Sequence, residues 1–579
     1  MADAATEFLL NNLKELVQYE AHLINDTEGN IEKLKSDLLH FQAFLKDTVK
    51  MRKSNERIEL MRKEIHNVVY DVEDIIDAYM AKHKDAGKSS RFFKKFLTTH
   101  QSLLNLHTIG QKVEAISGRV TQLRKDVNLT TDDDDKKEIP SEPRPPRKDK
   151  NVVGFQDVTD RLIHRLTQEA DGLDVISLTE DYEISASKLI RMWIGEGFIQ
   201  QKDARTQLEE VGQNYLKDLI SRNLVKTLKF RADGNVKTCQ IHDTLRDFCR
   251  MEAATENFLQ EIRLNEQGEC VPPIFEWCRR LSIHSDCKRY ISSKSSTPRA
   301  RSFVCFSKEP CDELSGKDST NLIKAFKFLR VFDIQPLILK DIDTDLYTLI
   351  HMRYIALFIT LSMLSPDFNK ICNMQTLIVN TTSPTLTVKA NIWRMRHLRY
   401  FKTNASATLP SAKSGDCANE LQTLGLISVE SCKGLHKRAP NLKKLGIRGK
   451  LALLSEEKGP FDSVRKMRYL GKLKLVNDKA QETESLQKLE VLKLKYQAFI
   501  GNSWELEDAI GGFPSLQFLH VEQTDLAFWQ AKSHHYPRLR SLVLKHCDKL
   551  REIPVDLGKA SEFKLSIFPP PPPAPAPAK

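Results

Sequence analysis

Hydrophobic residues recur at helical spacing in four blocks of the N-terminal quarter of the chain. The second block runs from Ile31 to Val49 and the fourth from Leu106 to Val127, with an apolar residue every three or four positions. That spacing gives each helix one apolar stripe, and such stripes bury against one another in a bundle. Residues 1–128 are therefore predicted to form a four-helix bundle.

The C-terminal half has a longer period. From about residue 280 the pattern L-x-x-L-x-L recurs at intervals of roughly 20–29 residues, the period of leucine-rich repeats, as in Leu421–Leu426 and Leu489–Leu494. The leucines are expected to point inward, while the intervening residues, rich in Arg, Lys, Gln and His, face a concave surface suited to protein recognition. Residues 280–565 are predicted to form this solenoid. Residues 566–579 are a Pro/Ala tail without a capping repeat, which predicts a truncated or altered C-terminus.

Two short regions lead from the bundle toward the repeats. Residues 129–150 carry the like-charge run Asp132–Asp135 and a group of prolines, a composition that predicts a linker. Residues 151–179 include Leu173–Leu178, a short apolar run suited to a buried strand. A new domain is therefore expected to begin near residue 151.

Residues 180–260 have the pattern of a winged helix. A first helix is predicted from Ser187 to Gly195 and is expected to end at the glycines Gly195 and Gly197. A second amphipathic helix is predicted from Leu208 to Ser221. Two such helices followed by short strand-like segments are typical of this module.

The charge pattern bears on nucleic acid as a partner. A winged helix can read a DNA groove with its second helix, and the net charge of +11 fits an anionic partner or membrane surface. The basic residues are spread along the chain, however, and the second helix carries the acidic residues Glu209, Glu210 and Asp218. The sequence therefore favours internal packing of this helix and disfavours nucleic-acid binding.

Composition places the chain among soluble, multidomain proteins. Its 579 residues are enough for about three or four domains, and 40% are hydrophobic and 28% charged. No apolar run of transmembrane length occurs, no secretory signal pattern is present, and Ala2 stands where N-myristoylation needs glycine. The eleven cysteines form no C-x-x-C pair or zinc-ligand cluster, so reduced thiols and a cytoplasmic location are expected.

The acidic residues Glu73, Asp74 and Asp77 lie close together on one predicted helix. Glu73 and Asp77 are four positions apart and share a helix face, where like charges cost roughly 0.2–0.5 kcal/mol per pair. This arrangement favours a basic partner, although a solvated acidic face has the same pattern. No metal site and no catalytic group are predicted from it.

Four short motifs together resemble one protein family. They are Met1-Ala2-Asp3-Ala4, Glu73-Asp74-Ile75-Ile76-Asp77, Val152-Val153-Gly154-Phe155 and Ile241-His242-Asp243. With the repeats, they make residues 1 to about 565 similar to plant coiled-coil NB-ARC leucine-rich-repeat (CC-NLR) disease resistance proteins of the late-blight-resistance type. The fold class implied is multidomain α plus α/β: an Rx-type four-helix bundle, a nucleotide-binding remnant with a winged helix, and a repeat solenoid.

The resemblance implies roles for two sets of N-terminal residues. Glu73, Asp74 and Asp77 would dock the bundle onto the chain's own repeats. The first helix would leave the bundle on activation and associate with the plasma membrane, but its apolar face also fits an ordinary bundle helix. That face comprises Phe8, Leu9, Leu13 and Leu16.

The resemblance also implies a nucleotide site. Residues 151–179 would be the start of the NB-ARC domain. Its adenine-lining residues would be Val152, Val153, Gly154 and Phe155. In the switch motif, His242 would sense the β-phosphate of ADP and Asp243 would orient the loop, with Ile241 in place of the usual methionine.

The phosphate-binding loop of that site is missing. Nucleotide phosphates and Mg²⁺ are held by G-x-x-x-x-G-K-[ST], and this motif occurs nowhere in the 579 residues. The sequence continues from Thr179 directly to Glu180, where the loop would follow the strand. Each hydrogen bond to a charged group contributes about 1.5–3 kcal/mol, so losing several weakens binding by orders of magnitude. Neither tight ADP or ATP binding nor enzymatic activity is therefore expected.

Three functions follow as hypotheses. The first is a plant innate-immunity receptor homologue, for effector recognition and hypersensitive-response signalling, with a defective nucleotide switch. Its partners would be pathogen effectors, guarded host proteins and other NLRs, and its location would be cytoplasmic or peripheral at the plasma membrane. The second is a non-switching decoy or regulator of full-length receptors, or a non-functional truncated remnant. The third is a winged-helix nucleic-acid binder.

Overall fold

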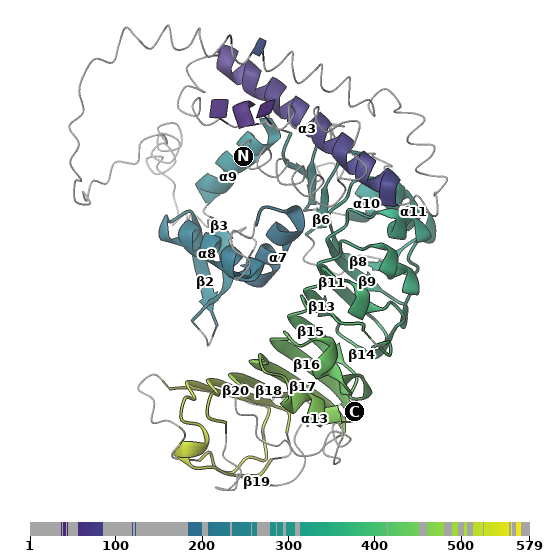
Figure 1. Cartoon of the computed structure of the whole chain (residues 1–579). Coiled ribbons are helices and arrows are strands. Elements are labelled where there is room, and N and C mark those ends of the chain that lie inside the picture. Colours follow the sequence, from purple (N-terminus) through teal and green to yellow (C-terminus); the bar gives the residue numbers. More distant parts are fainter. Residues whose placement is uncertain are drawn as a thin grey trace, which may run out of the picture. The chain divides into compact units, whose positions relative to one another are not determined.

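Figure 1 shows the computed structural model of the chain. The chain divides into two compact units. One contains the N-terminal residues and two short later segments. The other contains most of the winged helix and all of the repeats. The structure describes, with short internal gaps, residues 56–84, 183–199, 206–262, 278–306, 313–450, 460–479, 489–495, 503–505, 513–557 and 563–568, and a few helical residues within 36–44 and 118–122.

The N-terminal unit is described mainly through one long helix. Helix α3 (Glu56–Lys84) buries Ile58, Ile65 and Val69, which follow helical spacing, as expected for a helix with one packed face. The other predicted helices lie largely outside the described residues. The four-helix arrangement of residues 1–128 therefore stays a prediction.

The winged helix has the predicted helices at nearly the predicted positions. Its elements are β1 (Ile184–Ser185), α7 (Ala186–Glu196), α8 (Leu208–Ser221), β2 (Val225–Phe230), β3 (Val236–Ile241) and α9 (Asp243–Thr255). The strands form one small sheet in the order β1-β3-β2. This module follows the expected helix–helix–hairpin order.

The end of α7 differs from the prediction in one respect. Gly197 alone terminates the helix: its φ of 86° is left-handed, and its N–H donates to the carbonyl oxygens of Trp193 and Ile194. Gly195 lies inside the helix and is buried. It is therefore a packing position and not part of the cap.

The repeats form one long parallel sheet. In order of pairing, its main strands are β4 (Gln260–Ile262), β5 (Arg280–Ile283), β6 (Ser302–Cys305), β8 (Val331–Leu339), β9 (Tyr354–Ile359), β11 (Thr376–Thr381), β13 (Tyr400–Lys402), β15 (Thr423–Ile427), β16 (Lys444–Lys450), β17 (Lys472–Lys479), β18 (Val491–Lys495), β20 (Phe518–Glu522), β22 (Ser541–Lys545) and β23 (Lys564–Phe568). The sheet thus begins before the expected boundary at residue 280 and continues past the one at 565.

Shorter elements complete each turn of the solenoid. The additional strands are β7 (Glu313–Leu314), β10 (Met363–Leu364), β12 (Thr385–Val388), β14 (Ser406–Thr408), β19 (Ser503–Glu505) and β21 (Phe528–Gln530). The helices are α10 (Cys287–Ser292), α11 (Gly316–Lys324), α12 (Leu435–Arg438) and α13 (Pro460–Arg465), with 3-10 turns at Thr344–Thr348, Pro366–Lys370, Ile392–Arg394, Glu430–Cys432 and Ser533–His535.

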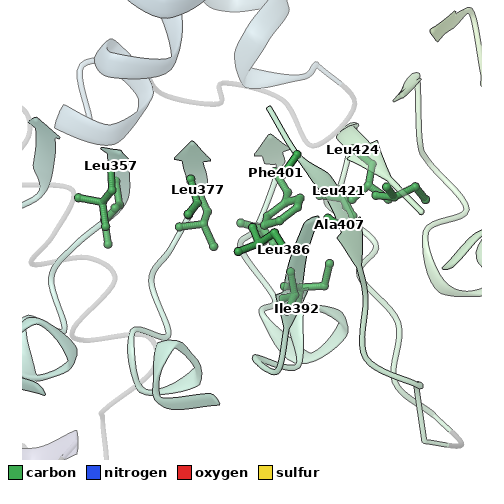
Figure 2. Packing of buried hydrophobic residues seen from close by; sticks show 14 of the residues in the cluster. Leu357, Leu377, Leu386, Ile392, Phe401, Ala407, Leu421 and Leu424 are labelled. Carbon is green, nitrogen blue, oxygen red and sulfur yellow. The ribbon is translucent and has the colours of Figure 1, made fainter. Parts of the chain in front are cut away.

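One buried column runs through the repeats. Phe332, Ile355, Leu377, Phe401 and Leu424 are consecutive register partners on neighbouring strands. All five are at most 2% exposed, and Figure 2 shows Leu377, Phe401 and Leu424 within the packed interior. Because each repeat buries its leucines only against its neighbours, this column is what makes the array one continuous core.

Strand β17 is a repeat that the sequence pattern did not single out. Its leucines Leu473 and Leu475 are buried and continue the column between β16 and β18. The segment Leu470–Leu475 does match L-x-x-L-x-L. Its distance from the preceding copy, which begins at Leu442, also fits the repeat period, so the sequence does carry a signal for this strand.

Candidate functional site

Helix α7 packs on the concave face of the solenoid, within the second unit. A small apolar cluster separate from the main core lies on this face and comprises Val304, Val331, Tyr354, Ala356 and Ile378. Met192 of α7 packs against it. Strand residues that a free solenoid would expose are therefore covered by the winged helix.

Gly195 allows this close approach. A Cβ at this position would lie 3.0 Å from Cβ of Tyr354 and 3.2 Å from Cγ2 of Val331. Both distances are shorter than ordinary carbon–carbon contact. The absence of a side chain at Gly195 therefore lets the helix backbone lie directly on strands β8 and β9.

The first polar contact of the interface is buried. Lys188 Nζ of α7 lies 2.7 Å from Asp333 Oδ2, and the Asp333 side chain is 0% exposed. The Tyr354 hydroxyl donates to the same carboxylate at 3.3 Å. Burial and the Asp333 charge hold the pKa of Tyr354 well above its ordinary value, so the phenol stays protonated and can donate.

A second contact lies at the end of α7. Glu196 is buried, accepts from Arg280 Nη2 of β5 at 2.8 Å, and also accepts from the Ser302 hydroxyl of β6. The Arg280 guanidinium lies 4.1 Å from the ring centroid of Phe258 and 4.9 Å from that of Phe198. Contact with these two aromatic rings helps to orient the guanidinium toward Glu196.

The third contact joins α8 to the middle repeats. Arg399 donates through Nε and Nη2 to the two carboxylate oxygens of Glu209, at 2.9 and 2.6 Å, and Gln422 Nε2 donates to Glu209 at 3.0 Å. A third donor of Arg399 holds Glu420. Bidentate geometry of this kind gives a charge-assisted pair both strength and orientation.

The Glu209 environment favours the charged carboxylate. Burial raises the pKa of Glu209, but the hydrogen bonds and positive charge of Arg399 outweigh it, and the pKa lies below its ordinary value. The neighbouring residue Glu210 differs: its side chain is 55% exposed and lies 3.8 Å from Lys443 Nζ. Glu209 thus carries the specific contact, and Glu210 only a surface charge pair.

These three contacts hold and align the winged helix on the repeats. Each places a charged group of the winged helix against an opposite charge of the repeats. Within the described ranges, no group of His, Cys, Asp and Glu side chains is arranged to hold a metal ion. No helix in the described part of the chain is long and apolar enough to cross a membrane.

The predicted site residues are not brought together by the described structure. On α3, Glu73 and Asp77 are buried and Asp74 is half-buried. Ile241 ends β3, and Asp243 begins α9. The predicted residues outside the described part of the chain are His242, Val152, Val153, Gly154, Phe155, Phe8, Leu9, Leu13 and Leu16. Their roles stay predictions.

The docking residues Glu196, Asp333 and Arg399 were not found by sequence reasoning. Glu209 was noted as acidic on a helix expected to pack internally, and its contacts agree with internal packing. Its partner Arg399 lies 190 positions away. In the sequence, Arg399 is marked only by its place just before a repeat strand. Arginine and lysine occur at that place in several repeats, so this position alone could not identify Arg399 as the partner of Glu209.

Two family models match this chain. The Rx N-terminal domain matches residues 5–99. The disease resistance protein winged helix domain matches residues 179–249, the region that contains α7, α8 and the small sheet. Both assignments fall on the two regions where the sequence motifs had indicated them.

Curated relatives are similar over about two thirds of the chain. A late blight resistance protein homolog of Solanum demissum is 30% identical over 422 residues, covering 65% of this chain and 32% of that protein. A late blight resistance protein of the same plant is 29% identical over 425 residues, with coverages of 65% and 32%. The chain therefore spans about a third of the length of these relatives.

Solved structures offer only distant similarity. An internalin of Listeria monocytogenes is 14% identical, covers 48% of this chain and 82% of that chain, and has a TM-score of 0.32. A leucine-rich-repeat protein of Leptospira interrogans is 12% identical, covers 48% and 87%, and has a TM-score of 0.29. The solenoid assignment rests on the strand registers and the buried column described above.

Proposed function

We propose that this chain, which is a CC-NLR-like resistance protein by its N-terminal, winged-helix and repeat regions, serves plant defence by recognising other proteins without a nucleotide switch of its own. One observation supports this most: a winged helix of the disease resistance type is docked on the repeats by Lys188, Glu196 and Glu209, while the sequence before it lacks the phosphate-binding loop. No enzymatic reaction is proposed.

The docking contacts define what a partner must overcome. A ligand shifts an equilibrium between docked and undocked forms only by its differential affinity for the two. Without a nucleotide switch to move the winged helix, the contacts at Lys188, Glu196 and Glu209 favour the docked form. A pathogen effector or guarded host protein would either bind the exposed repeat surface or compete for the docked face.

The remaining features of the proposal come from the resemblance. The bundle would dock on the repeats through Glu73, Asp74 and Asp77, and the protein would act in the cytoplasm or at the inner face of the plasma membrane. Signalling to the hypersensitive response would pass through intact NLRs, because this chain lacks the loop that ADP and ATP require.

A second candidate is a decoy or regulator of intact receptors. It is favoured by the same pairing of a docked winged helix with a missing phosphate loop. Nucleic-acid binding receives less support, because Glu209 places an acidic part of α8 against Arg399 of the repeats.

Transient expression in leaves tests the proposal. The chain is expressed alone, with candidate effectors, and with an intact resistance protein plus its effector. We expect no cell death from the chain alone, and a change in cell death that requires both the effector and the intact receptor. A change that occurs without any effector favours the regulator. Unchanged cell death and unchanged pathogen growth across all combinations contradicts a defence role.

A further inference from the structure

A pocket of about 840 Å³ lies between the winged helix and the concave face of the repeats, inside the second unit. Strands β13, β15, β16, β17, β18 and β20 contribute its floor. The start of α7 and the β2–β3 hairpin contribute its wall. A volume of this size is typical of small-molecule sites, which span about 300–1,000 Å³.

Lysines line the floor in register. Lys444 of β16 is the register partner of Lys472 of β17, and Lys474 of β17 is the partner of Lys493 of β18. Lys402 of β13 extends the row. Like charges at directly opposed positions of neighbouring strands are destabilising. Strand β17, through Lys472 and Lys474, therefore lies at the centre of a strongly positive floor.

The wall adds positive charge from the winged helix. Arg191 of α7, Arg231 after β2 and Lys237 of β3 all line the pocket. Arg231 donates to the Ser187 hydroxyl, and the Arg191 guanidinium lies 4.0 Å from the Tyr400 ring centroid. These contacts orient the two guanidinium groups without neutralising them.

None of the described residues that line the pocket is Asp or Glu. This contrasts with the rest of the interface, where Lys188 meets Asp333 and Arg399 meets Glu209. In the described part of the chain, no carboxylate lies within ion-pair distance of Lys474 or Lys493. At this one place, both sides of the interface present the same charge.

Burial and the excess positive charge together lower the pKa of a floor lysine, Lys474. Burial, followed by the charges of Lys495, Lys402 and Lys493, lowers the pKa of Lys474 to about 8. The nearby carboxylate of Glu522 offsets this only in part, because it is held by Lys495 and lies 3.1 Å from His520 Nε2 and 3.7 Å from Lys545 Nζ. Lys474 and Lys493 are half-buried and have no carboxylate of the described residues within ion-pair distance, so their ammonium groups form a field that attracts anions.

We propose that this pocket binds a small polyphosphorylated anion, which bridges Arg231 and Lys237 of the winged helix to Lys474 and Lys493 of the repeats. Cations converge on one volume from floor and wall, which suits a compact ligand with several charges. An extended acidic peptide would instead spread its charges along about 3.3 Å per residue. Lysine and arginine are the side chains that hold phosphate oxygens in proteins. The site does not depend on the proposed defence role.

Bound anion strengthens the docking of the winged helix. Without it, the positive wall and floor repel each other across the pocket. With it, each side gains charge-assisted hydrogen bonds to the same ligand. Ligand that binds only the docked form stabilises that form by mass action.

Calorimetric titration of the purified full-length chain tests the site, with tripolyphosphate, orthophosphate and a hexaglutamate peptide as probes. We expect tripolyphosphate to bind with a micromolar Kd and at least about tenfold more tightly than orthophosphate, because it reaches more of the cations. The affinity should fall as salt is raised. The double variant Lys474→Gln, Lys493→Gln should bind at least about tenfold more weakly.

The matched control is Lys389→Gln, Lys433→Gln, which removes two exposed lysines outside the pocket. It should keep wild-type affinity within about twofold. The pocket variant should unfold at a higher temperature than wild type in low salt when no ligand is present, because like-charge repulsion is removed. A variant that has lost the site thus binds tripolyphosphate more weakly but unfolds at a higher temperature, whereas a damaged fold would lower both the affinity and the unfolding temperature.

Three results would overturn the site. The first is tripolyphosphate that binds no more tightly than orthophosphate. The second is an equal loss of affinity in the pocket variant and the control. The third is hexaglutamate that binds more tightly than tripolyphosphate, which would assign the surface to an acidic peptide.

Discussion

Replacing Glu209 by glutamine tests the docking of the winged helix on the repeats. The change keeps the side-chain shape but removes the charge that faces Arg399. Of the carboxylate's three donors, two come from Arg399, at 2.9 and 2.6 Å, and one comes from Gln422, at 3.0 Å. An amide has only one oxygen, so at least one guanidinium N–H is left facing an N–H₂ group.

The magnitude follows from these contacts. A hydrogen bond to a charged group contributes about 1.5–3 kcal/mol. The Glu209 side chain is 28% exposed, so water offsets part of the loss. We therefore expect about 1.5–2 kcal/mol, which raises the population of the undocked form roughly 10- to 30-fold.

Amide hydrogen exchange measures this opening directly. Helix α8 has 14 residues, and isolated helices of about this length are marginal in water, so an undocked α8 exchanges quickly. Exchange at Leu208–Leu216 should accelerate by the same factor in the Glu209→Gln chain. The solenoid strands serve as the internal reference and should keep their wild-type rates.

The neighbouring residue provides the matched control. Glu210→Gln removes the same charge from the same helix turn, but Glu210 is 55% exposed and lies 3.8 Å from Lys443 Nζ. A pair of this kind contributes about 0–1 kcal/mol, so exchange should change less than about fivefold. Wild-type exchange in Glu209→Gln, or equal acceleration in both variants, would refute the assigned role of the Arg399 contact.

Three further predictions follow from the structure. Gly195→Ala should lower the thermal unfolding midpoint, because overpacking against Tyr354 and Val331 costs about 1–3 kcal/mol; in an undocked helix the same change would stabilise by roughly 0.5–1 kcal/mol, so a raised midpoint would contradict docking. Leu473→Ala should destabilise the repeats by about 2–5 kcal/mol in urea unfolding, because Leu473 is 2% exposed in the buried column. The control Lys466→Ala truncates an exposed side chain outside that column and should cost under about 0.5 kcal/mol; equal effects of the two changes would count against β17 as a core repeat. The Lys474 pKa of about 8 lies below its ordinary value of 10.5, so its destabilisation is fully present below pH 8 and is lost as pH rises toward 10.5; the stability difference between wild type and Lys474→Gln should therefore shrink over that window, and a constant difference would contradict the assignment.

The sequence pattern predicted the elements that periodic burial creates. Helices α7 and α8 and most repeat strands fall at the expected positions, because a one-sided apolar stripe and L-x-x-L-x-L both report burial directly. The missed strand β17 carries the same pattern at Leu470–Leu475. Its distance from the preceding copy at Leu442 lies within the expected period of roughly 20–29 residues, so β17 is no physical departure from the repeat.

The docking site needed the folded structure. The partners Glu209 and Arg399 are 190 positions apart, and Glu196 and Arg280 are 84 apart. Neither pair has a local pattern that one sequence could reveal. Gly195 shows the same limit, because a glycine near a helix end predicts a cap, while the close approach of Tyr354 is visible only in three dimensions.

The basic pocket combines both kinds of information. The sequence showed that the residues between the repeat leucines are rich in Lys and Arg. Only the strand register places Lys444 beside Lys472 and Lys474 beside Lys493, and only the docked hairpin brings Arg231 and Lys237 above them. Charge that is spread along the sequence is thus gathered at one place in the fold.

Titration of the full-length chain with Mg²⁺ and ADP tests the central claim, a resistance protein without a nucleotide switch, most directly. The Lys474→Gln, Lys493→Gln chain is used in parallel, because it removes the basic pocket as a second phosphate site. The account predicts that this variant binds ADP with a Kd weaker than about 1 mM. A stoichiometric complex with a micromolar or tighter Kd in the same variant would contradict it.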